Sequence, residues 1–235
     1  MNGGVGANLH RPYPLSKRFF AHPALLGRVK TADAGDCLNT NSSVYSRLHP
    51  SQGCFQPGIS RYFAMRIVSG KFAGRHLTSP SRNVRPTSEG VRDRWLELLE
   101  ADLTGARVLD LFAGSGAIGL EAISRGARYA DFVEDGAGAL HSLKANVAVL
   151  RVTKKCRVFK QDAIPFVARL DAGAYDVCFA DPPYGSRKLD LVIERWREVA
   201  FAGVLTIEHS KDHDIPMKGK SYDFEGDTRV TVLRR

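Results

Sequence analysis

The feature that most constrains the fold is a regular alternation of apolar runs and helical stretches that follows Gly105. The helical stretches lie at 116–126, 137–150, 163–170 and 188–199, and each separates two short apolar runs. Strands that take turns with helices pair in parallel and carry the helices on both faces of the sheet. The sequence therefore predicts an α/β fold. The apolar runs are RVLDLF, YADFVE, CRVFK, YDVCFA and GVLTIEH.

The two flanks of the alternating region have other patterns. The tail SYDFEGDTRVTVLRR has two strand-like runs around Gly226, which predict an antiparallel hairpin at the end of the sheet. Ahead of the alternation, MRIVSGKFAGRHLTSP predicts two short strands around a glycine turn. RPTSEGVRDRWLELLEADL then predicts a helix capped by Thr87 or Ser88. Its predicted apolar face consists of Val91, Trp95, Leu98 and Leu99.

Residues 1–64 differ in composition from the rest of the chain. Gly, Pro, Ser and Asn fill 22 of these 64 positions, and two acidic residues stand against seven Lys and Arg. No apolar periodicity persists there, so we expect the segment to be disordered. Three interpretations stay open: an inert extension or a start called upstream of Met65, a basic arm for nucleic acid, or a transit peptide.

Charge and cysteine usage narrow the class of partner and compartment. The net charge of +9 and the pI of about 9.6 favour a polyanionic partner, with nucleic acid ahead of an anionic membrane. The four cysteines include no CxxC pair, so we expect no metal site and a reducing, cytoplasmic location. No uncharged apolar stretch reaches the roughly 18 residues that a membrane span needs.

The segment VLDLFAGSGAIGLEA predicts a strand, a tight glycine loop and a helix. Gly114, Gly116 and Gly119 fit the pattern G-x-G-x-x-G, which in this context indicates a nucleoside cofactor lying against bare backbone. Glu134 ends the next apolar run, where an acid can hold ribose hydroxyls. Asp110 would repel a pyrophosphate and attract the ammonium of a methionine moiety, which favours S-adenosylmethionine over NAD. Capping of the turn is the alternative role for Asp110.

The third apolar run ends in the sequence FKQDAI. Asp162 in this sequence is placed to accept a hydrogen bond from the amino group of an adenine. The competing interpretation is that Asp162 caps a helix that starts at Ala163.

The fourth apolar run ends in the corner DPPY. Ligands of open parallel sheets bind beyond the carboxyl ends of the strands, where this corner would lie. The two prolines remove backbone donors, which leaves the Asp181 carboxylate and the Pro182 carbonyl as acceptors. Acceptors that hold both hydrogens of an aromatic amine would aim its lone pair at an electrophilic methyl group. Tyr184 offers a face on which a base can stack; the alternative is a purely structural turn.

DLFAGSGAIGLEAISRGA and DPPY, preceded by MRIVSGKFAGRHL and RPTSEGVRDRWLELL, resemble the RsmD-type bacterial methyltransferases across residues 65–235. The resemblance implies a Rossmann-like class I methyltransferase fold. Its sheet would have seven mostly parallel strands with an antiparallel C-terminal hairpin, next to a small N-terminal β-hairpin and helix. The implied reaction is methyl transfer from S-adenosylmethionine to the N2 amine of a guanine in small-subunit (16S) ribosomal RNA. Residues 65–104 would contact RNA, and residues 105–235 would form the cofactor-binding domain.

The resemblance also implies a role for individual residues. The residues implied to bind the cofactor are Asp110, Phe112, Gly114, Gly116, Gly119, Glu134, Asp162 and Ala163. The residues implied to hold the guanine for catalysis are Asp181, Pro182, Pro183 and Tyr184. The residues implied to contact RNA are Arg66, Lys71, Arg75, Arg85 and Arg92. The chain departs from the family pattern at Gly90, Gly136 and Gly138.

We therefore expect a cytoplasmic monomer whose partner is ribosomal RNA or the assembling small ribosomal subunit. One alternative is an adenine-N6 DNA methyltransferase, although no segment is large enough for a target-recognition domain. A second alternative is an RNA-binding assembly factor without turnover, which would not need the DPPY corner. An NAD dehydrogenase is disfavoured by Asp110 and by the absence of a recognisable hydride-transfer arrangement.

Overall fold

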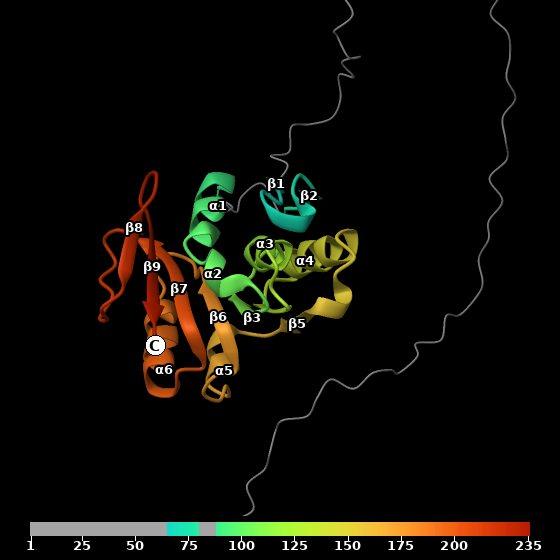
Figure 1. Ribbon diagram of the computed structural model, residues 1–235. Coiled ribbons are helices and arrows are strands. Elements are labelled where there is room, and N and C mark those ends of the chain that lie inside the picture. Colours follow the sequence, from blue (N-terminus) through green and yellow to red (C-terminus); the bar gives the residue numbers. More distant parts are fainter. Residues whose placement is uncertain (1–64, 80–87) are drawn as a thin grey trace, which may run out of the picture. The chain divides into compact units, whose positions relative to one another are not determined.

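A computed structural model describes residues 65–79 and 88–235 of the chain (Figure 1). The interpretations of residues 1–64, the cap role of Thr87 and the RNA contact of Arg85 lie outside these described residues. The described residues all belong to one compact unit, Gln56–Arg235.

A seven-stranded sheet organises the described residues, with its strands in the order β5-β4-β3-β6-β7-β9-β8. The five strands from β5 to β7 pair in parallel, and β9 pairs antiparallel with both β7 and β8. The predicted α/β fold, with a mostly parallel sheet and an antiparallel C-terminal hairpin, is confirmed. The strands are β3 (Arg107–Leu111), β4 (Tyr129–Glu134), β5 (Cys156–Lys160), β6 (Tyr175–Ala180), β7 (Ala202–Ser210), β8 (Lys220–Asp223) and β9 (Thr228–Arg234).

Helices cover both faces of this sheet (Figure 1). One face packs against α1 (Glu89–Glu97), α2 (Glu100–Leu103), α3 (Ala117–Ser124) and α4 (Ala137–Val149). The other face packs against α5 (Ala163–Val167) and α6 (Lys188–Val199). Two short 3-10 helices, η1 (Gly70–Phe72) and η2 (Thr153–Lys155), complete the described elements.

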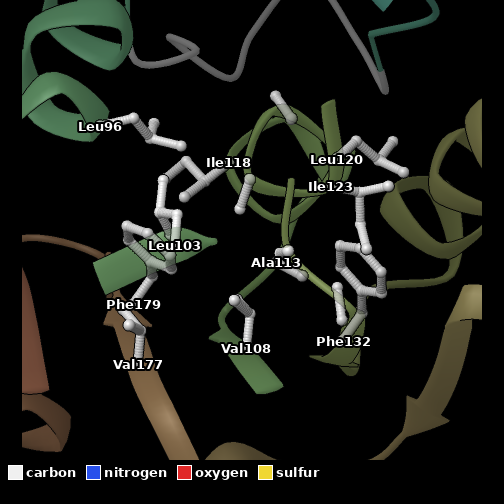
Figure 2. Packing of buried hydrophobic residues seen from close by; sticks show 14 of the residues in the cluster. Leu96, Leu103, Val108, Ala113, Ile118, Leu120, Ile123, Phe132, Val177 and Phe179 are labelled. Atoms are coloured by element: carbon white, nitrogen blue, oxygen red, sulfur yellow. The ribbon is translucent and has the colours of Figure 1, made fainter. Parts of the chain in front are cut away.

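The core on the α1–α4 side fixes the first helices to the centre of the sheet. Figure 2 shows Val108 and Phe179 from the strands beside Ile118 of α3. Trp95 of α1 is fully buried, and its indole donates a 2.6 Å hydrogen bond to the Thr206 hydroxyl of β7. The same indole meets the ring of Phe179 edge-on. Helix α1 is thus held over β6 and β7, whose carboxyl ends carry the DPPY corner and the residues that follow β7.

The predicted N-terminal hairpin is present, although its strands β1 (Met65–Arg66) and β2 (His76–Leu77) are only two residues long. They are short because η1 and its flanking turns occupy the connection. Side chains of the sheet-covering helices bind the hairpin backbone. Glu121 of α3 accepts hydrogen bonds from the amides of Val68 and Ser69, at 2.8 and 2.7 Å. The hairpin is therefore docked on α3 by its own main chain.

Two features of the described ranges, 65–79 and 88–235, bear on the class of protein. No helix in these ranges has the length and apolar character required to cross a membrane. The same ranges contain no group of three or more His, Cys, Asp and Glu side chains arranged to hold a metal ion.

Candidate active site

The sheet reverses its strand order between β3 and β6, which is where open α/β sheets bind their ligands. From β3 the chain passes through α3 to β4 on one side, while β6 pairs with the other side of β3. Leu111 and Ala180 are partners in the parallel register. The next residues along the two strands are Phe112 and Asp181. The glycine loop and the DPPY corner therefore leave the sheet side by side.

Asp110 points into the start of α3. Its Oδ2 atom accepts a 2.9 Å hydrogen bond from the amide of Gly119, which lies in the first turn of that helix. The side chain is buried, and burial raises the pKa of Asp110 to about 7. The turn-capping alternative for Asp110 is thus observed, and its contact with a cofactor ammonium stays a prediction.

Glu134 joins the loop after β3 to the loop after β4. Its Oε2 atom accepts a 2.7 Å hydrogen bond from the Gly114 amide, and its Oε1 atom accepts one of 2.7 Å from Gly136. A Cβ atom on Gly136 would lie 2.9 Å from Oε1, so glycine leaves room for the carboxylate. Gly136 departs from the family pattern, and its lack of a side chain leaves the space that the Glu134 carboxylate occupies.

Two glycines of the loop serve different steric needs. Gly119 lets α3 approach β4, because a Cβ atom there would lie 2.4 Å from a ring carbon of Phe132. Gly114 has a φ of +55° and would have open space around a Cβ atom, so its backbone faces the room that a ligand needs. Phe112 also adopts a positive φ, of 61°, a strained conformation that clusters at ligand sites.

Asp162 caps α5, as the second interpretation of this residue predicted. Its Oδ1 atom accepts a 2.8 Å hydrogen bond from the amide of Ile164, and Ala163 is buried behind it. Its Oδ2 atom pairs with Lys188 at 2.5 Å, and this hydrogen bond lowers the pKa of Asp162. Lys188 also lies 5.8 Å from the ring centre of Phe112. Sequence reasoning missed Lys188, which follows the DPPY corner by four residues.

The DPPY corner presents an exposed aromatic ring beside a buried acid. Tyr184 is 50% exposed, which makes it one of few large apolar side chains at the surface of the described part. Its hydroxyl donates to Glu208 Oε1 at 3.3 Å and lies 3.4 Å from the Thr228 hydroxyl. Glu208 was missed from the sequence because it lies inside an apolar run. The sequence did contain an indication of Glu208, because Glu208 follows apolar residues just as Glu134 and Asp181 do.

A pocket opens next to this corner. The pocket is lined by residues of the corner, of the end of β7 and of the start of α6. The buried Pro182 is one of these lining residues. The residues that line the pocket are Pro182, Pro183, Tyr184, Gly185, Ser186, Leu189, Glu208, His209, Ser210 and His213.

Three of the basic residues predicted to contact RNA lie at the surface of the N-terminal hairpin. Arg66 pairs with Glu89 at 3.0 Å and is still 57% exposed at its side chain. Lys71 is exposed on η1. Arg75 is exposed and donates a 3.2 Å hydrogen bond to the Val149 carbonyl. Their contact with RNA stays a prediction.

The prediction that Arg92 contacts RNA is wrong for this structure, because Arg92 is fully buried. Its guanidinium donates to the Arg66 carbonyl and lies 3.6 Å from Glu121, and burial lowers the pKa of Arg92. Trp95 and Leu99 of the predicted apolar face of α1 are buried, while Val91 and Leu98 are only partly buried. The residues that the helix and its end bury are Arg92, Trp95, Leu96 and Leu99, which follow an i, i+3, i+4, i+7 spacing.

Comparisons with known proteins agree with this arrangement. The sequence family described as conserved hypothetical protein 95 matches residues 65–225. Ribosomal RNA small subunit methyltransferase D of Escherichia coli K12 is 32% identical over 165 residues, which cover 68% of this chain and 82% of that protein. YlbH of Bacillus subtilis strain 168, described as an rRNA methyltransferase, is 33% identical over 159 residues, or 65% and 86% of the two chains. The solved structure of Escherichia coli yhhF, described as a methyltransferase, superposes with a TM-score of 0.65 and 28% identity, covering 73% of this chain and 98% of that one.

Proposed function

Because the chain belongs to the RsmD-type family of methyltransferases, we propose that it methylates the N2 amine of a guanine in small-subunit (16S) ribosomal RNA. The methyl donor in this proposal is S-adenosylmethionine. The observation that carries the proposal is the pairing of Leu111 with Ala180, which puts the glycine loop beside the DPPY corner. A methyl donor on the loop and an amine on the corner would then share one crevice.

The glycine loop has the features that a nucleoside cofactor needs. Bare backbone at Gly114 faces open space, and the Asp110 carboxylate lies at the end of the strand that leads to it. In the proposal Asp110 and Phe112 face the methionine end, Glu134 holds the ribose, and Asp162 with Ala163 binds the adenine. The remaining glycines, Gly116 and Gly119, shape the turn. When bound, S-adenosylmethionine supplies an electrophilic methyl group on a sulfonium.

The DPPY corner prepares the amine. The lone pair of an exocyclic guanine amine is spread into the ring, which makes the nitrogen a poor nucleophile. Hydrogen bonds from its two hydrogens to the Asp181 carboxylate and the Pro182 carbonyl localise that lone pair and stabilise the positive charge that develops on nitrogen. Pro183 keeps the corner rigid. The exposed face of Tyr184 stacks against the base and excludes water from one side.

The basic side chains of the N-terminal hairpin would position the RNA. Arg66, Lys71 and Arg75 are exposed, and phosphate contacts of this kind fix register without reading sequence. Arg85, outside the described residues, is proposed to act with them. The partner is ribosomal RNA or the assembling small subunit, and the enzyme works as a cytoplasmic monomer.

The test is incubation of the protein with small subunits, naked small-subunit RNA and DNA, each with labelled S-adenosylmethionine. Nucleoside mass spectrometry should detect N2-methylguanosine in the RNA. Asp181→Ala should reduce the rate by at least about 10²–10³-fold, the usual size of losing one stabilising group, without a change in melting temperature. Asp171→Ala, at an exposed aspartate away from the corner, is the matched control and should retain full activity. Methylated adenine, labelled DNA, or full activity of Asp181→Ala would contradict the proposal.

A further inference from the structure

A buried carboxylate, Glu208, lies on the wall of the pocket beside the DPPY corner. It is 7% exposed and comes from β7, the strand that pairs in parallel with β6. Ala180 and Ile207 are partners in that register, and Asp181 and Glu208 are the next residues on the two chains. The two acids therefore leave neighbouring strands at the same level.

Tyr184 connects the DPPY corner to Glu208. Its hydroxyl donates to Glu208 at 3.3 Å, so the far end of the ring is held at the carboxylate. Burial raises the pKa of Tyr184, and the charges of Glu208 and Asp181 raise it further, because both carboxylates act on the same hydroxyl. A base stacked on the exposed Tyr184 ring would thus have its edge near both acids.

The pocket wall also contains a hydroxyl that calls for a polar ligand. The Ser186 Oγ atom is buried and has no hydrogen-bond partner among the described residues. A buried hydroxyl without a partner is unfavourable, because it has lost its hydrogen bonds to water. A ligand with an acceptor atom on its edge would satisfy it.

The set of groups on this wall matches one base better than the others. The Watson–Crick edge of guanine carries an acceptor at O6 and donors at N1 and N2. Ser186 can donate, and Glu208 and the Pro182 carbonyl can accept, while the Asp181 carboxylate, which does not line the pocket, precedes Pro182 in the corner. Adenine carries an unprotonated N1, whose lone pair would face a carboxylate and be repelled.

We propose that Glu208 selects guanine by accepting a hydrogen bond from its N1–H, while the DPPY corner holds the N2 amine. This inference rests on the function proposed above and adds the residue that decides which amine-bearing base is accepted. Discrimination arises because a base without N1–H presents a lone pair to the buried Glu208 carboxylate and is repelled by it.

The test compares guanosine with 2-aminopurine at the methylated position of a synthetic small-subunit RNA. 2-Aminopurine keeps the N2 amine but has a lone pair in place of N1–H and also lacks O6, so the change of preference in a Glu208 variant is the readout that isolates the N1 contact. The wild-type protein should prefer guanine by at least about tenfold in kcat/KM, the lower range for one good base contact. In Glu208→Gln, the amide oxygen can still accept from Tyr184 while the amide nitrogen donates to N1 of 2-aminopurine. The preference for guanine should therefore fall at least tenfold in this variant.

Glu225→Gln is the matched control, because Glu225 is exposed on the loop between β8 and β9. This variant should keep the wild-type preference. Wild-type rates that are equal for the two bases would overturn the proposal without any variant, and so would an unchanged preference in a folded Glu208→Gln protein. Failure of the wild-type protein to form N2-methylguanosine would instead contradict the proposed function, so the two failures are distinct.

Discussion

The glycine loop and the DPPY corner lie side by side but obtain their rigidity in different ways. In the loop, acidic side chains bind backbone amides: Asp110 binds Gly119, and Glu134 binds Gly114. In the corner, two successive prolines fix the backbone covalently and remove donors. The Tyr184 hydroxyl ties the corner to Glu208 of β7 and Thr228 of β9 through long hydrogen bonds. Changes in the loop should therefore alter stability and cofactor affinity together, while changes in the corner should alter the rate.

The largest of the remaining effects is expected from Gly119→Ala. The new methyl group would lie 2.4 Å from a ring carbon of Phe132, so α3 or the ring must shift. Overpacking of this kind lowers the free energy of unfolding by about 1–3 kcal/mol. Urea unfolding measures the loss, and calorimetry should show weaker cofactor binding.

Gly90→Ala is the control for this substitution, because a Cβ atom on Gly90 of α1 has nothing within 4 Å. Alanine in this helix should raise the free energy of unfolding by about 0.5–1 kcal/mol. Equal effects of the two substitutions would show that the contact with Phe132 does not limit the loop.

An effect of intermediate size is expected from the titration of Asp110. Its pKa is about 7, and in the proposed function the cofactor ammonium binds the ionised carboxylate. Cofactor affinity should therefore fall about tenfold from pH 8 to pH 6, as the ionised fraction drops. Calorimetry across this range measures it, and Asp110→Asn should remove the decline. A decline that persists in Asp110→Asn would exclude Asp110 as its source.

The same shift affects stability with a defined sign. Burial raises the pKa of Asp110 above its value in the unfolded chain, so the folded state keeps a proton that the unfolded state releases. The contribution of Asp110 to the free energy of unfolding is therefore present at about pH 4 and is lost as pH rises toward 7. Comparison of wild type with Asp110→Asn isolates this contribution.

The smallest effect is expected from Tyr184→Phe in the corner. It removes hydrogen bonds of 3.3 and 3.4 Å but keeps the exposed ring on which a base would stack. We expect kcat/KM to change by less than about threefold, since exposed, long hydrogen bonds contribute little. Tyr184→Ala should be far more damaging in KM for RNA. If the Phe variant were as damaged as the Ala variant, the hydroxyl and not the ring would be the functional group.

The sheet could be predicted closely from the sequence, because its central strands are buried on both faces. CRVFK matches the partly exposed edge strand β5 to the residue, and YADFVE and YDVCFA match the central, buried strands β4 and β6. Such strands appear as continuous apolar runs that end where the chain reaches water. The N-terminal strands were less well defined, because side chains of α3, more than 40 residues away, stabilise that segment.

The details of the site depended on contacts that sequence spacing does not encode. Asp110 and Asp162 were each given two roles, and the structure shows the capping role of both. Arg92 looked like a surface residue because the apolar spacing of α1 fits two faces, and the ion pair with Glu121 decides between them. The place of Glu208 beside Asp181 follows from the pairing of β7 with β6.

The side chain of Asn146 in α4 has a consequence for any shortened form of this chain. Its amide nitrogen donates to the carbonyls of Ser115 and Thr78, and its oxygen accepts from the Thr78 amide. The Asn146 side chain thus links the glycine loop, at Ser115, to Thr78, the residue that follows β2. A version that began at Ser88 would lack Thr78, and the Asn146 side chain would keep only its hydrogen bond to the Ser115 carbonyl.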